Sequence, residues 1–98
     1  MIDLDHIFDT PKDICIETAK KAVARRKALR ITQKELADMT GVSFASVRRF
    51  ETTGQISFES LVRIAIALDV KDDIKNIFQE RKVYRSIQDV IDEANQKR

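Results

Sequence analysis

The sequence predicts an all-α fold, in which a compact five-helix domain is followed by a short C-terminal helical extension. Apolar residues recur at helical spacing along most of the 98 residues. Only two glycines and one proline interrupt this pattern, and the proline stands where a helix would begin. We therefore expect an N-terminal arm over residues 1–9, a helical domain over 10–79 and the extension over 80–98.

The first helix is expected to begin at Thr10 and to run to about Leu29. The hydroxyl of Thr10 can cap it, Pro11 suits its first position, and Asp13 stands at the third. Because a guanidinium on an apolar face needs a partner, Arg26 requires an acid nearby unless it is exposed and contributes little. The residues expected on the inner face are Ile14, Cys15, Ala19, Ala22, Val23 and Arg26.

Residues 33–51 predict two short helices joined by a glycine turn. Thr32 and Glu35 have the spacing of a capping box at the start of the first helix. Gly41 supplies the positive φ that often ends a helix, and Ser43 can cap the second helix. Helical periodicity gives the second helix two faces, with Ser43, Val47, Phe50 and Glu51 on one and Ala45, Arg49 and Thr52 on the other.

The fourth predicted helix begins after Ser57 and runs to about Leu68. Apolar residues cover most of its circumference, which is typical of a central core helix. A fifth helix is expected over residues 71–79. The residues of the fourth helix expected to be buried are Phe58, Leu61, Val62, Ile64, Ala65 and Leu68.

The C-terminal extension predicts a short amphipathic helix over residues 86–95, capped by Ser86. Its apolar residues are Ile87, Val90 and Ile91. Because so small an apolar stripe cannot sustain a helix in isolation, we expect this helix to dock on another surface.

The charges are distributed unevenly along the chain. Residues 20–49 carry nine basic and two acidic side chains, a net charge of +7, whereas the remainder carries −5. Solvated helix faces are one explanation for such a basic segment. The coincidence with the two-helix stretch instead favours a polyphosphate partner.

The composition argues against several other classes of function. His6 is the only histidine and Cys15 the only cysteine, so a catalytic constellation or a four-ligand zinc site is not expected, and no cofactor is predicted. A single cysteine forms no internal disulfide, which favours a reducing cytoplasm. No apolar run is long enough to cross a membrane.

The two-helix stretch resembles the helix-turn-helix of the phage-repressor (Cro/Xre) family, and the similarity extends over about residues 18–70. The matching features include Gln33 at the first helix, the Gly41-Val42 turn and the Phe50-Glu51 pair. The resemblance implies a lambda-repressor-like fold and sequence-specific binding of double-stranded DNA, with repression by a homodimer. The DNA-binding residues that it implies are Thr32, Gln33, Lys34, Ser43, Phe44, Ala45, Ser46, Arg48, Arg49 and Thr52.

The same resemblance implies a role for three further features. Arg26 and Glu51 match a structural ion pair, and Ile77 and Phe78 fall where a dimer or partner interface is common. Helix 43–51 would read the major groove, with Arg49, and with less support Arg48, contacting guanine. A purely electrostatic role is the alternative for Arg48.

Two positions depart from the family pattern. Phe44 and Ala45 stand where polar residues are frequent, so contact with thymine methyl groups is the option left to them. The run over residues 48–57 and the C-terminal extension are also similar to antitoxins that accompany HipA-type toxins. This implies an alternative function, in which the chain neutralises a toxin protein while it regulates its own operon.

Overall fold

The computed structural model describes residues 9–96, so the predicted arm lies, apart from Asp9, outside the described residues. The described part of the chain folds into helices and contains no strand. In chain order the helices are α2 (Pro11–Ala28), α3 (Gln33–Thr40), α4 (Phe44–Thr53), α5 (Phe58–Ala67), α6 (Lys71–Lys75) and α7 (Ile87–Gln96). The all-α prediction is confirmed, with α2 to α6 as the five helices of the domain.

Side-chain caps fix the starts of four helices of the domain. The Thr10 hydroxyl accepts a hydrogen bond from the amide of Asp13 at 3.1 Å, and the Asp13 carboxylate accepts one from the Thr10 amide. Thr32 and Glu35 form the same reciprocal capping box at α3. Ser43 and Ser57 cap α4 and α5. Each cap satisfies backbone donors that a helix end leaves without partners, so the sequence sets these boundaries locally.

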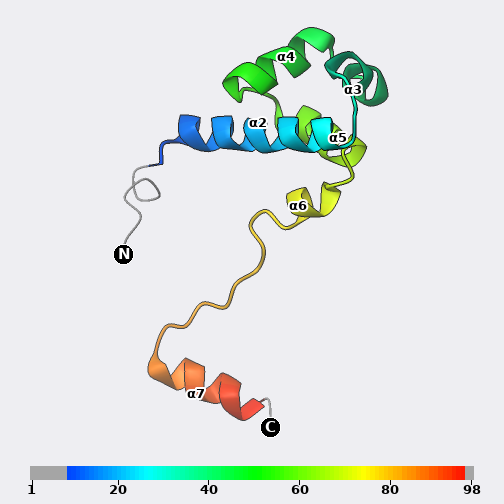
Figure 1. Ribbon diagram of the computed structural model, residues 1–98. Helices are drawn as coiled ribbons and strands as arrows, with labels where there is room; N and C mark the ends of the chain where they lie inside the picture. Colours follow the sequence, from blue (N-terminus) through cyan, green and yellow to red (C-terminus); the bar gives the residue numbers. More distant parts are fainter. Residues whose placement is uncertain (1–8, 97–98) are drawn as a thin grey trace.

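Helix α2 lies across the domain in Figure 1, with α3 and α4 above it, α5 overlapping its C-terminal end in this view and α6 below. Their facing sides enclose one core, in which Ala19 of α2 is 1% exposed. The largest fully buried side chains are Phe50, Leu36, Ile64, Leu68 and Val47. This core fixes the orientation of α4, because Val47 and Phe50 on its inner face are 0% and 2% exposed.

Two glycines end helices in the left-handed conformation. Gly41 has φ +74° after α3, and Gly54 has φ +78° after α4. Gly54 is also buried against α2, where a Cβ atom would lie 2.6 Å from the carbonyl carbon of Cys15. The absence of a side chain at Gly54 therefore allows the end of α4 to approach the backbone of α2.

Several expectations about burial and helix length were wrong. Phe58 is 61% exposed, because it is the first residue of α5 and precedes the turns that pack on the core. Ile14 is 51% exposed and Cys15 is also exposed, since the buried residues of α2 begin only at Ala19. The predicted fifth helix over 71–79 ends at Lys75 as α6, and Phe78 adopts a positive φ of 56°.

The C-terminal extension forms a helix that lies apart from the domain. Figure 1 shows α7 at the end of a connecting segment, residues 76–86, which makes a turn at 76–78 and then leads away from α6. The amide of Asp89 donates to the Ser86 hydroxyl at 3.3 Å, as expected for the cap. The apolar residues Ile87, Val90 and Ile91 are 80%, 47% and 46% exposed. The docking expected for this helix is thus not made within the single chain.

Candidate nucleic-acid interface

The outer face of α4 is a solvent-exposed surface held by a buried inner face. Ala45, Arg49 and Thr52 are exposed, opposite the buried Val47 and Phe50. This is the division that helical periodicity predicted. The remaining exposed residues at the start of the helix are Ser43, Phe44, Ser46 and Arg48.

The end of α4 is attached to α2 by the ion pair implied for Arg26 and Glu51. Nε and Nη2 of Arg26 donate to the two carboxylate oxygens of Glu51 at 2.7 and 2.9 Å. The third donor, Nη1, bonds the carbonyl of Ile31 at 2.8 Å. Because the two side chains are only 10% and 7% exposed, the pair is shielded from water and restrains α4 relative to α2.

Gln33 joins this buried network. Its side-chain amide donates to Oε1 of Glu51 at 2.9 Å, so the side chain bridges the start of α3 to the end of α4. An amide nitrogen carries two hydrogens, and this bond uses one of them. The sequence did not predict this contact, because the two residues are 18 positions apart and belong to different helices.

The start of α3 presents its amides beside a capping carboxylate. The Glu35 carboxylate accepts from the Thr32 amide at 3.0 Å, and this hydrogen bond lowers the pKa of Glu35. The Thr32 amide is therefore engaged within the chain, while Lys34 on the same turn is exposed. The positive end of the α3 dipole and the lysine charge both favour an anion here.

The two arginines of α4 are held in different ways. Nη2 of Arg49 donates to Oε1 of Gln55 at 2.5 Å, across the turn at Gly54. The guanidinium carbon of Arg48 lies 5.7 Å from the centre of the Phe44 ring, within the range of a cation–π contact. Neither guanidinium is turned into the core, since both residues are exposed.

The hydroxyl groups of α4 are bonded to their own helix. The Ser43 hydroxyl donates to the Ser46 hydroxyl at 2.7 Å and accepts from the Ser46 amide at 3.1 Å. The Thr52 hydroxyl donates to the carbonyl of Arg48 at 2.8 Å. These bonds order the side chains along the edge of the surface without removing their exposure.

A polar cleft of about 340 Å³ lies beside Arg49, between α4 and the start of α5. Sequence reasoning missed Gln55 and Ser60 as part of this surface. Ser57 was noted only as a helix cap. The only sequence feature that pointed to Gln55 is the preceding Gly54, because a glycine that ends α4 turns the chain back beside this helix. The residues lining the cleft are Ser46, Arg49, Gln55, Ile56, Ser57 and Ser60.

Ile77 and Phe78 lie on a different part of the molecule. They follow α6, and their exposed fractions are 45% and 100%. They are thus available for contact with another molecule, separately from the α4 surface. Within the part of the chain that the structure describes, no helix combines the length and hydrophobicity of a transmembrane span.

Comparison with known proteins identifies the domain that carries the α4 surface. A helix-turn-helix family model matches residues 24–74, just over half of the chain, from the last turns of α2 to α6. Neither the curated proteins nor the solved structures contain a match. The comparisons give no support to the similarity with antitoxins of HipA-type toxins. The chain belongs to the Cro/C1-type helix-turn-helix family of DNA-binding transcriptional regulators.

Proposed function

We propose that this regulator is a repressor that binds a two-fold symmetric operator as a homodimer, with α4 in the major groove. The observation that carries the proposal is the amphipathic division of α4. Val47 and Phe50 anchor the helix in the core, while Ala45 and Arg49 are exposed along its outer face. A helix presented in this way fits the major groove, where each base pair offers a distinct pattern of donors and acceptors.

Arg49 is the proposed base-reading residue. The planar guanidinium can donate two parallel hydrogen bonds to O6 and N7 of guanine. Its bond to Gln55 limits the conformations of the side chain, so less entropy is lost when DNA is bound. Phe44 and Ala45 offer apolar contact to thymine methyl groups at the start of the helix.

The remaining polar residues of the surface are assigned to the phosphate backbone. The start of α3 and the start of α4 both present helix N-termini, where amides and the dipole attract phosphate. Arg48 adds charge beside Phe44 without an assigned base. Contacts of this kind fix the register of the protein on DNA but read no sequence. The assigned residues are Thr32, Gln33, Lys34, Ser43, Ser46, Arg48 and Thr52.

A homodimer follows from the small size of the reading surface. One helix of this length covers few base pairs, so useful specificity requires two half-sites. Two α4 helices related by a two-fold axis would contact half-sites about 34–36 Å apart, one turn of DNA. A dimer bound across a promoter then competes with the transcription machinery.

The test is selection of bound duplexes from a random DNA pool with the full chain. The expected result is an enriched sequence with two inverted half-sites, one DNA turn apart. Adding the protein to a transcription reaction driven by a promoter that overlaps this sequence should reduce the transcript. A pool that stays random after selection would refute sequence reading, and an enriched single half-site would refute the dimer. Increased transcription would refute repression.

A further inference from the structure

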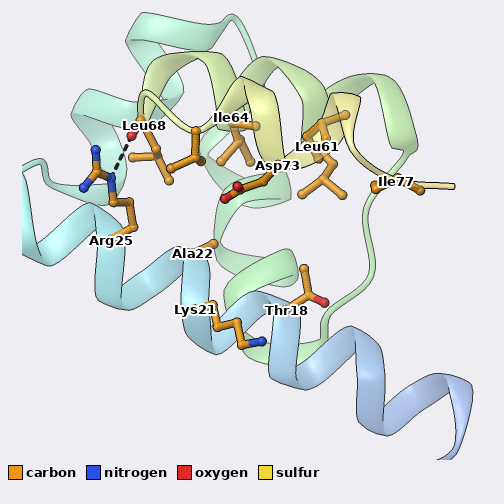
Figure 2. A pocket seen from close by; sticks show the side chains of 12 residues that line it. Thr18, Lys21, Ala22, Arg25, Leu61, Ile64, Leu68, Asp73 and Ile77 are labelled. Carbon is orange, nitrogen blue, oxygen red and sulfur yellow. Dashed lines mark hydrogen bonds between the residues drawn. The ribbon is translucent and has the colours of Figure 1, made fainter. Parts of the chain in front are cut away.

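An apolar groove of about 530 Å³ runs between α2, α5 and α6, away from the outer face of α4. Figure 2 shows Leu61 and Ile64 of α5, together with Leu68 directly after this helix, opposite Ala22 of α2. Arg25 borders the groove and donates to the carbonyl of Leu68 at 2.9 Å. Lys21 lies on the same α2 side, and Ile77 closes the far end in Figure 2. The groove therefore has an apolar floor, with Arg25 and Lys21 on its α2 side and the carboxylate of Asp73 of α6 also lining it.

Helix α7 has the complementary surface. Ile87, Val90, Ile91 and Ala94 fall on one face at spacings of three and four residues. The rest of α7 carries three acidic residues and no basic one. Ten residues are fewer than an isolated helix needs for stability in water, so α7 requires a surface that covers its apolar face. The groove and the apolar face of α7 thus match in hydrophobicity, and the α2 side of the groove carries the charge opposite to that of the acidic residues of α7.

We propose that α7 of one chain docks in the α2–α5–α6 groove of a second copy, and that the exchange is reciprocal. The inference rests on the proposed homodimer and names the contact that forms it. A docked α7 would also cover Ile77, which lines the groove and is 45% exposed.

The geometry of the connecting segment favours exchange over docking within one chain. Phe78 has φ +56°, a conformation that non-glycine residues seldom adopt, and there the chain turns away from the groove that Ile77 closes. The radius of gyration is 18.6 Å, against about 13 Å for a compact chain of this length. Residues 79–86, which follow the turn at 76–78, can span about 26–29 Å when extended, which is close to the width of a small domain.

Reciprocal exchange also covers the groove and the apolar face of α7 in both chains. In a two-fold symmetric pair each chain offers one groove and one helix, so both grooves and both helices are covered and the assembly closes. The Glu93 carboxylate of α7 forms an ion pair with Lys82 and accepts a hydrogen bond from the Tyr84 hydroxyl. Both partners lie in the connecting segment, so the end of this segment and α7 would dock as one unit.

The experiment measures the molar mass of the full chain in solution as a function of concentration. Val90→Asp places a charge in the apolar stripe of α7, and Ile77→Asp places one at the end of the groove, at a half-exposed position. Each variant alone should dissociate into monomers. Each substitution disrupts both docking contacts of the symmetric dimer. A tenfold loss of affinity at each contact therefore raises the dissociation constant of the dimer about a hundredfold. The control is Gln96→Asp, which adds the same charge to α7 outside the stripe and should leave the dimer unchanged.

A mixture of the two variants separates the proposal from its alternatives. The Val90→Asp chain keeps an intact groove and the Ile77→Asp chain keeps an intact α7, so the mixture should form a heterodimer held by one exchanged helix. Docking of α7 within its own chain predicts that the mixture stays monomeric. A parent that is monomeric, or a Val90→Asp chain that remains dimeric, would overturn the exchange. Circular dichroism of each variant verifies that the domain has folded.

DNA binding distinguishes failure of this inference from failure of the proposed function. The Val90→Asp chain should bind a single half-site with the affinity of the parent and lose the extra affinity for two half-sites. A chain that binds no operator in either form contradicts the proposed function. A parent dimer that the Val90→Asp change leaves intact contradicts only the α7 exchange.

Discussion

Arg26 and Glu51 form a two-point ion pair between the third-last residue of α2 and the last turns of α4, with nitrogen–oxygen distances of 2.7 and 2.9 Å. Gln33 donates to the same carboxylate from the start of α3. Three helices of the DNA-binding domain therefore meet at one carboxylate. The position of α4 relative to α3 depends on Glu51 as well as on the apolar core.

Replacing Glu51 with alanine should destabilise the fold strongly. The Arg26 guanidinium would stay buried without its counter-charge, which costs about 3–5 kcal/mol. Urea unfolding followed by circular dichroism measures the change. The matched control is Glu59→Ala, which removes an exposed partner of Arg63 at 3.2 Å and should cost less than about 0.5 kcal/mol. Equal unfolding midpoints for the two variants would contradict a structural role for the buried pair.

The two glycines should respond differently to alanine. Both have positive φ, which costs an alanine about 1–2 kcal/mol. At Gly41 the added Cβ would lie 3.4 Å from the flexible end of Arg63, so little more should be lost. At Gly54 it would lie 2.6 Å from the backbone of Cys15, so α4 must move away from α2. Gly54→Ala should therefore lower the free energy of unfolding more than Gly41→Ala. An equal loss would show that the close approach is not needed.

Changing Arg49 to alanine should flatten the preference among operator sequences. Loss of a guanine contact removes about 1–3 kcal/mol of discrimination at one base pair. Lys27→Ala is the comparison, because an exposed lysine at the end of α2 should weaken binding to all duplexes about equally and reduce the salt slope by about one. Anisotropy titrations with the operator and its single-base variants measure both effects. Unchanged base preference in the Arg49 variant would refute the base-reading role.

Gln55 should contribute to DNA binding only through Arg49. The 2.5 Å hydrogen bond between them orders the guanidinium, and holding one such side chain is worth about 0.5–1.5 kcal/mol. Gln55→Ala should thus weaken operator binding, by less than Arg49→Ala does. In the double variant the Gln55 change should have no further effect. Additive losses would instead indicate that Gln55 contacts DNA independently.

Glu35 should make stability depend on pH below neutrality. Hydrogen bonds from the amide and the hydroxyl of Thr32 lower the pKa of Glu35 in the folded state. The stabilisation is therefore present above the unfolded pKa of about 4.3 and is lost as the pH falls through the lower folded value. Glu35→Gln keeps a capping side chain that does not titrate. The difference in unfolding free energy between parent and variant should fall towards zero in acid, and a constant difference would contradict the assignment.

The sequence was sufficient for features that depend on near neighbours. Capping at Thr10, Thr32, Ser43 and Ser57 involves residues three positions apart, and the glycine at position 41 supplies a φ that other residues avoid. The period of 3.6 residues was enough to separate the buried from the exposed face of α4. It failed at Phe58 and Ile14, because periodicity gives a direction around a helix but not how far along the helix the core extends.

What the sequence alone determined is the set of helices, their starts, and which side of α4 faces solvent, since hydrogen bonds within a turn and the helical repeat are local. What only the tertiary structure decided is which distant side chains meet. Gln33 donates a hydrogen bond to Glu51, and Arg49 donates one to Gln55 across a turn. Gly54 packs closely against the backbone of Cys15. These contacts depend on how closely and at what angle the helices cross, and that is set by the packing of the whole core.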